Sequence, residues 1–159
     1  MSEQLVSELP TYVVPLQKIK LLLPNPSVAE IIPYEPLQRV QETPDWFLGL
    51  LGWRGVQVPV VSVEMLTTAR ATFSLVSVSS ACMVIVRGVT ASEEVPYFAI
   101  VAQTLPHLIR LSAEALYETP EEPASTELAR ARLGEDIVAI PDIETIEKAV
   151  EQISAAGGT

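Results

Sequence analysis

The sequence predicts a mainly β protein of barrel type that ends in one helix. Three observations support this prediction. Short apolar runs rich in β-formers recur along the chain, 13 prolines interrupt any long helix, and one segment near the C-terminus has helical periodicity. With 159 residues, 48% of them hydrophobic, the chain is large enough to bury the core of one domain or of two closely packed lobes.

The first half of the chain begins with two strands that we expect to form a hairpin. The runs TYVVPL and IKLLLP are short, rich in β-formers and limited by proline near their ends. The apolar segment NPSVAEII follows, and the apolar pattern restarts at ETPDWFLGL and continues to Val63. Residues 1–10 are polar and are expected to form a flexible arm.

The middle of the chain predicts a loop followed by three strands. Residues 66–80 are rich in Ser and Thr and are expected to cross between two lobes, with a short strand near Phe73–Val78. ACMVIVRG and VPYFAIVAQ are two strand candidates joined by the polar turn VTASEE. HLIRL is a third short strand candidate.

The C-terminal third predicts a strand and then the helix. TELARARL is expected to form one or two helical turns, and DIVAI a strand that Pro141 closes. The helix follows from apolar residues at spacings of 3, 4 and 3, with Asp142 as N-cap: Ile143, Ile146, Val150 and Ile153. Residues 154–159 are expected to be a flexible tail.

The charge and the single cysteine exclude several classes of protein. The formal net charge of −10 disfavours binding to nucleic acid and to anionic membrane surfaces. No apolar run approaches the roughly 20 residues that a membrane-spanning helix needs, and the N-terminus lacks the layout of a signal peptide, so we expect a cytoplasmic protein without membrane insertion. Cys82 allows no intrachain disulfide and is expected to be buried.

The sequence shows no pattern typical of a catalytic, metal or cofactor site. His107 is the only histidine, and no Gly-rich nucleophile turn, zinc spacing or Walker loop is present. The pairs Glu93-Glu94 and Glu121-Glu122 are interpreted as solvated turns. The acidic stretch 114–151 is interpreted as a solvating face, with steering of a basic partner as the alternative. We therefore expect no enzyme activity, no cofactor and no metal.

One arginine interrupts the apolar segment GLLGWRGVQVPVVSV. Gly52 and Gly55 predict a tight turn that places Trp53 and Arg54 between two strands. Tryptophan and arginine are the residue types most enriched at interface hot spots, so the turn is a candidate partner-binding surface. Alternatively, Arg54 pairs with an internal carboxylate and braces the hairpin, and both interpretations can hold together.

These segments resemble the CheW-like domain over about residues 11–153. The family's V-x-E-I segment is matched by Val28, Glu30 and Ile31. Its P-x-x-x-x-G-x-x-N-L-R-G-x-x-x-P-V-x-D-L stretch is matched by Pro44, Gly49, Arg54, Gly55, Pro59 and Val60. The stretch DIVAIPDIETIEKAV is similar to the family's last strand and closing helix. The resemblance implies two SH3-like five-stranded β-barrel lobes that share a core. We expect these lobes to comprise roughly residues 11–65 with 136–153, and residues 66–135.

The resemblance implies a non-enzymatic adaptor that couples the cytoplasmic tips of chemoreceptors to the regulatory domain of a CheA-type histidine kinase, with Arg54 associated with this coupling. The chain departs from the family pattern at Gly52, Trp53 and Ser62, and near Ala102 or Gln103. These departures suggest a divergent member, similar to the ChpC-like adaptors of chemosensory systems linked to type IV pili and twitching motility.

The matched motifs also suggest a specific site. We expect a charge-assisted hydrogen bond between Glu30 and Arg54 that fixes the hairpin and leaves Trp53 free for a partner. The expected partner-binding residues are Trp53, Arg54, Gly55, Val56, Val58 and Val61, although strand alternation turns part of this set inward. Two alternatives are a small-molecule-binding barrel with its ligand between the lobes, and an enzyme that uses His107 or a carboxylate pair.

Overall fold

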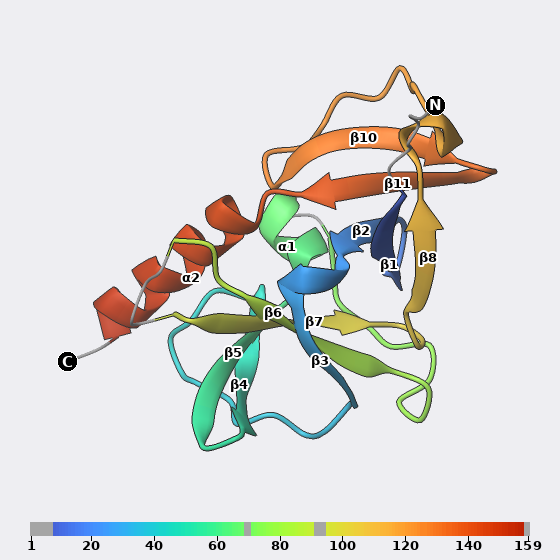
Figure 1. Ribbon diagram of the computed structural model, residues 1–159. Helices are drawn as coiled ribbons and strands as arrows, with labels where there is room; N and C mark the ends of the chain where they lie inside the picture. The colour runs from blue at the N-terminus through green and yellow to red at the C-terminus, as the bar shows by residue number, and fades with distance from the viewer. Residues whose placement is uncertain (1–7, 69–70, 91–94, 158–159) are drawn as a thin grey trace.

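Two β-sheets, each curled into a small barrel, make up the computed structural model, which describes residues 8–68, 71–90 and 95–157 (Figure 1). The first sheet has the strand order β8-β1-β2-β11-β10-β9. Its strands are β1 (Leu9–Pro15), β2 (Lys20–Pro24), β8 (His107–Leu111), β9 (Leu116–Tyr117), β10 (Glu127–Leu133) and β11 (Asp136–Pro141). The hairpin predicted from TYVVPL and IKLLLP is confirmed by the antiparallel pairing of β1 with β2.

The second sheet has the order β3-β6-β7-β5-β4. Its strands are β3 (Val28–Pro33), β4 (Phe47–Trp53), β5 (Val56–Val61), β6 (Cys82–Arg87) and β7 (Tyr97–Ala102). Helix α1 (Val63–Thr67) lies between the two sheets and α2 (Ile143–Gly157) at one side, while short 3-10 turns cover residues 25–27 and 113–115 (Figure 1).

The two barrels repeat one topology. Each contains two antiparallel hairpins, β1–β2 with β10–β11 and β6–β7 with β4–β5, and a parallel pair joins the hairpins. A bent segment closes each barrel: β8 continues past residues 113–115 into β9, and β3 continues to Gln38, which bridges to Leu50. Counting each bent segment once gives five strands per barrel, so the predicted fold of two five-stranded barrels and a C-terminal helix is confirmed.

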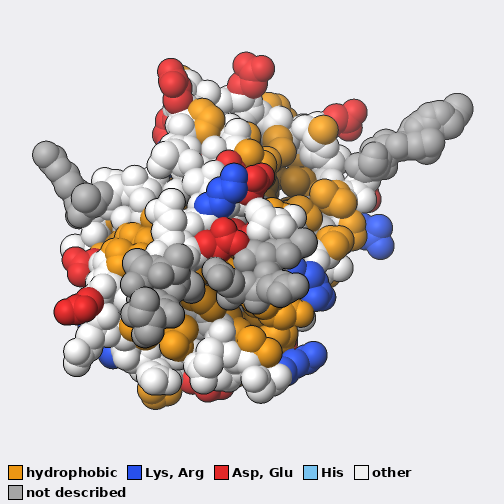
Figure 2. All heavy atoms as spheres, turned by 90° about the vertical axis from the view of Figure 1, so that its left-hand side faces the viewer, with side chains coloured by type: hydrophobic (Ala, Val, Ile, Leu, Met, Phe, Trp, Pro, Cys, Tyr) orange, Lys and Arg blue, Asp and Glu red, His pale blue; other side chains and the backbone are white. Residues whose placement is uncertain are grey.

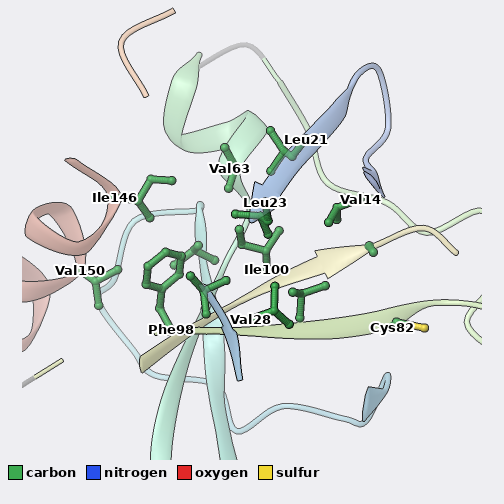
Figure 3. Packing of buried hydrophobic residues seen from close by; sticks show 14 of the residues in the cluster. Val14, Leu21, Leu23, Val28, Val63, Cys82, Phe98, Ile100, Ile146 and Val150 are labelled. Atoms are coloured by element: carbon green, nitrogen blue, oxygen red, sulfur yellow. The ribbon is translucent and has the colours of Figure 1, made fainter. Parts of the chain in front are cut away.

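One hydrophobic core joins the barrels and α2. Val14, Leu21 and Leu23 from the first sheet meet Phe98 and Ile100 from the second (Figure 3). The predicted apolar face of α2 is confirmed, because its central members Ile146 and Val150 are fully buried in this core and its outer members Ile143 and Ile153 pack against it. Asp142 caps the helix as predicted: its Oδ1 accepts the Thr145 N–H at 3.2 Å. A second cluster fills the second barrel alone.

Helix α2 is also tied to the second barrel by a buried carboxylate. Glu147 is fully buried and accepts the N–H groups of Val89 (2.8 Å) and Thr90 (3.3 Å) as well as the Thr90 hydroxyl. Gly88 packs so closely that a Cβ atom there would lie 2.9 Å from Glu147 Oε2. The helix that leaves the first barrel therefore fixes the β6–β7 connection of the second.

The sheets divide the chain differently from the expected lobes. The strands between residues 28 and 61 pair with β6 and β7, whereas β8, β9 and β10 return to the first sheet. The second barrel is thus one continuous insertion between β2 and β8, and the expected grouping of residues 11–65 with 136–153 is wrong. The cause is the pairing of β3 with β6, of β5 with β7 and of β8 with β1, long-range contacts for which a single sequence carries no local signal.

Four local predictions are also wrong. TELARARL forms strand β10 rather than helical turns, because it pairs with β11 through the turn at Gly134 (φ 63°). No strand forms at Phe73–Val78, and α2 extends through Gly157 into the expected tail. Strand β1 begins at Leu9, within the expected arm. Residues 1–7 and most of the turn VTASEE lie outside the described residues.

Acidic side chains project from the upper part of the face shown in Figure 2, which is the face of the molecule that carries α2. Apolar and basic side chains lie between and below them. No helix among the described residues is long and apolar enough to cross a membrane.

Candidate functional site

The candidate site is built on the tight hairpin between β4 and β5. Trp53 and Val56 are the last paired residues, so Arg54 and Gly55 alone form the turn. Both residues have positive φ, 52° for Arg54 and 78° for Gly55, which is the geometry of a type I′ turn. Glycine adopts this backbone region freely, but arginine rarely does. A tight turn is present as predicted, but it consists of Arg54 and Gly55, because Trp53 is paired within β4, and it holds Arg54 in a disfavoured conformation.

Glu30 on β3 contacts both Trp53, the last residue of β4, and Arg54 in the turn. Arg54 Nη2 lies 3.1 Å from Glu30 Oε1, so the expected contact is present as an ion pair. Trp53 Nε1 donates to the same oxygen at 2.8 Å. The Arg54 guanidinium carbon lies 5.0 Å from the centre of the Trp53 ring, a cation–π distance. One carboxylate oxygen therefore holds a tryptophan and an arginine together.

These contacts lie at the seam of the second barrel. Strands β3 and β4 are the two edges of that sheet, and they do not pair with each other. Gln38 and Leu50 exchange two main-chain hydrogen bonds (2.9 and 3.0 Å) at one point of the seam. Glu30, Trp53 and Arg54 join the edges at another, through side chains. The Glu30–Arg54 pair thus helps to close the barrel as well as bracing the hairpin.

Three of the six expected partner-binding residues are buried and are therefore wrong. Trp53 is 9% exposed and Val58 is 0% exposed, and both belong to the core of the second barrel, while Val61 is 0% exposed in the shared core. They are therefore not available to a partner, and the expectation that Trp53 stays free is wrong. The physical reason is strand alternation: Trp53 points to the same face as the buried Leu51.

The other three expected residues lie at the surface. The side chain of Arg54 is 69% exposed, Val56 is 37% exposed, and Gly55 is exposed. Gly52 and Gln57, which precede and follow the turn, are exposed as well. The hairpin tip therefore presents a guanidinium group and a small apolar residue on a rigid two-residue turn.

A model of the CheW-like domain matches residues 11–151 of the chain. The chain belongs to the CheW-like domain family. Its fold is also similar to the crystal structure of the scaffolding protein TtCheW from Thermoanaerobacter tengcongensis, with a TM-score of 0.65 at 14% sequence identity over 84% of this chain and 88% of that chain. No curated protein sequence matches the chain significantly.

A cavity of about 390 Å³ in this CheW-like domain is lined by the β1–β2 turn, by α1 with the residues after it, and by the start of β10. The small-molecule alternative would instead place its ligand between the two lobes. The acids that line the cavity are engaged within the chain. Glu64 accepts the N–H groups of Gln17 (3.2 Å) and Lys18 (2.8 Å), and Glu127 pairs with Arg130 at 2.9 Å. These bonds hold the β1–β2 turn against α1 and fix the start of β10, so we assign the lining polar groups a structural role.

The remaining candidate residues of the CheW-like domain lie apart from the hairpin. His107 is exposed at the start of β8. Cys82 is buried as predicted, and its burial raises the pKa of the thiol. Among the described residues, no group of three or more His, Cys, Asp or Glu side chains is arranged to hold a metal ion.

Sequence reasoning missed that Trp53 bonds Glu30 and that Gln38 bridges to β4. The first could have been inferred from the alternation of buried residues along Phe47, Gly49, Leu51 and Trp53, which turns the indole inward. The second had no local signal, since Gln38 lies outside any regular element.

Proposed function

We propose that this CheW-like domain is a non-enzymatic chemosensory adaptor that couples chemoreceptors to a CheA-type histidine kinase. Membership of the family supports a role as a chemotaxis adaptor or scaffold. The finer assignment, to kinase coupling, is supported chiefly by one observation. Arg54 is kept exposed in a backbone conformation that disfavours arginine, and an exposed residue held under such strain is typical of a functional site.

The proposed docking surface for the kinase regulatory domain is Arg54, Gly55 and Val56. Arginine contributes strongly to interfaces because it combines charge, planar hydrogen bonding and stacking. Only one of its N–H-bearing nitrogens is used by Glu30, so the guanidinium group retains donors for a partner. The two-residue turn loses little conformational entropy on binding because it is already rigid.

The second proposed partner is the cytoplasmic tip of a chemoreceptor, within a chemotaxis or pilus-motility pathway. An adaptor must hold two partners at once, so this second surface lies apart from the hairpin tip. The net charge of −10 supports association with partners that carry basic groups and not with nucleic acid.

Titration calorimetry of the chain against the regulatory domain of a CheA-type kinase from the same genome tests the proposal. We expect reversible binding that Arg54→Ala weakens by about tenfold, as loss of a central interface arginine does. Arg110→Ala is the matched control, because Arg110 is an exposed arginine on the other barrel. Absence of binding by the native chain would remove the kinase as a partner, and equal weakening by both variants would remove the hairpin tip as its surface.

A further inference from the structure

Strand β4 has one open main-chain position on its outer edge, next to Arg54. It is the last strand of its sheet, and it pairs with β5 on one side only. In the register of this hairpin, Trp53 and Val56 form a hydrogen-bonded pair, so the main-chain groups of Leu50 and Gly52 point away from β5. Leu50 uses both of its groups on Gln38. Among the residues that the structure describes, the N–H and C=O of Gly52 have no hydrogen-bond partner.

A proline ends the short ladder that would otherwise cover Gly52. The Gln38–Leu50 bridge is antiparallel, so the next pair along it would join Pro36 to Gly52. Proline has no N–H to give, and the ladder stops there. The missing proline N–H accounts for the open carbonyl of Gly52, and among the described residues the Gly52 N–H has no main-chain partner either.

The fold of the chain gives no reason for a glycine at position 52. A Cβ atom built there would meet nothing within 4 Å, and the backbone of Gly52 is not in the left-handed region. Glycine inside a strand costs stability and packs no side chain. Where the fold does not require it, such a glycine marks a place that another backbone approaches closely.

We propose that the edge of β4 at Gly52 binds a short extended segment of the kinase regulatory domain through main-chain hydrogen bonds. The inference rests on the proposed function and deepens it, since it names the mode of binding at the same hairpin. The segment pairs with β4 at Gly52 alone, between the Gln38–Leu50 bridge and the Glu30 contacts: Gly52 N–H donates to a carbonyl of the segment, and a segment N–H donates to Gly52 O.

The surroundings of Gly52 also define the chemistry of the segment. Arg54 lies two residues beyond Gly52 with its side chain 69% exposed, so an acidic side chain in the segment complements it. Val56, on the other side of the turn, is suited to a small apolar contact. The segment is therefore extended, carries an acid next to its paired residue, and needs no bulky side chain opposite Gly52.

Amide hydrogen exchange followed by NMR tests this mode directly. In the free chain the Gly52 amide is expected to exchange at the rate of an unpaired strand amide, and in the complex with the kinase regulatory domain its exchange should slow by at least about tenfold. Gln57 is the internal control, because it lies opposite Gly52 and its amide points away from β4. Binding without protection at Gly52 overturns the inference and leaves the adaptor function intact. Absence of binding overturns both.

A pair of variants at the same position gives a second test. Gly52→Pro removes the N–H donor, and an edge strand tolerates proline where its N–H faces outward. Gly52→Ala keeps the donor and places its Cβ in open space. We expect Gly52→Pro to weaken kinase binding by roughly threefold to tenfold relative to Gly52→Ala, which is the loss of one main-chain hydrogen bond. Equal affinities of the two folded variants would contradict the inference, and if Gly52→Pro fails to fold, the exchange experiment decides.

Discussion

Arg54 lies across the face of Trp53, with its guanidinium carbon 5.0 Å from the centre of the indole ring. Both side chains contact one oxygen of Glu30, but only the indole is buried. Stability and binding therefore depend on different members of this group. The buried tryptophan and its acceptor stabilise the barrel, whereas the exposed arginine is free to contact a partner.

Removal of the shared acceptor should cost more stability than removal of the arginine. Glu30→Ala leaves the buried Trp53 Nε1–H without an acceptor, which costs about 1–3 kcal/mol. Arg54→Ala removes an exposed ion pair, which contributes about 1 kcal/mol or less. Urea unfolding of the two variants measures both free energies. Glu30→Gln keeps an acceptor for the indole and should lie between them. Equal loss in Glu30→Ala and Arg54→Ala would contradict this division of roles.

Replacement of Arg54 by asparagine should separate stability from binding. Asparagine adopts positive φ more readily than arginine and is favoured before glycine in a type I′ turn. The gain in turn stability offsets the lost ion pair, so we expect the free energy of unfolding to stay within about 1 kcal/mol of the native value. Binding to the kinase regulatory domain should still fall as it does in Arg54→Ala. A variant that binds as well as the native chain would show that the guanidinium group is not needed.

Two valines on β5 offer a matched comparison. Val56→Ala trims a side chain at the hairpin tip and should reduce kinase affinity with little change in stability, because Val56 is partly exposed. Val58→Ala creates a cavity in the core of the second barrel and should destabilise the fold by about 2 kcal/mol, with unchanged affinity of the folded protein. Thermal unfolding and calorimetry on both variants check the pair, and the reverse pattern would refute the proposed surface.

The buried carboxylate of α2 should be important for stability. Glu147→Ala leaves the N–H groups of Val89 and Thr90 and the Thr90 hydroxyl without their acceptor, which should cost about 3 kcal/mol. Glu144→Ala is the control, because Glu144 forms an exposed pair with Lys148 on the same helix. Denaturant unfolding should show a clearly lower free energy of unfolding for Glu147→Ala than for Glu144→Ala. Similar stabilities would mean that solvent replaces the lost acceptor.

The sequence could predict the features that depend on local patterns. The α2 face and its Asp142 cap follow from helical spacing, and the hairpin turn at Arg54 follows from its glycines. The Glu30–Arg54 contact was accessible because the family resemblance aligns an acid with a base. Such features need only a few neighbouring residues or one matched motif.

The features that depend on long-range pairing could not be predicted in the same way. Residues 127–133 are rich in good helix formers, yet tertiary pairing with β11 makes them a strand. The strand signal in this segment is the alternation of Arg130 and Arg132 with Ala129, Ala131 and Leu133. Interface statistics favour a surface position for Trp53, but strand alternation places it inside.

The parallel pair between β2 and β11 has a consequence for how the chain is made. Leu21 pairs with Ala139, so the hairpin that leaves the ribosome early must wait for a strand synthesised much later. The second barrel is continuous in sequence and can form while translation proceeds, but its shared core still lacks Ile146 and Val150 from α2. Until β11 has been synthesised, the β1–β2 hairpin exposes the edge of β2. An open edge of this kind is prone to pair with other chains, and chaperones that bind nascent chains would protect it.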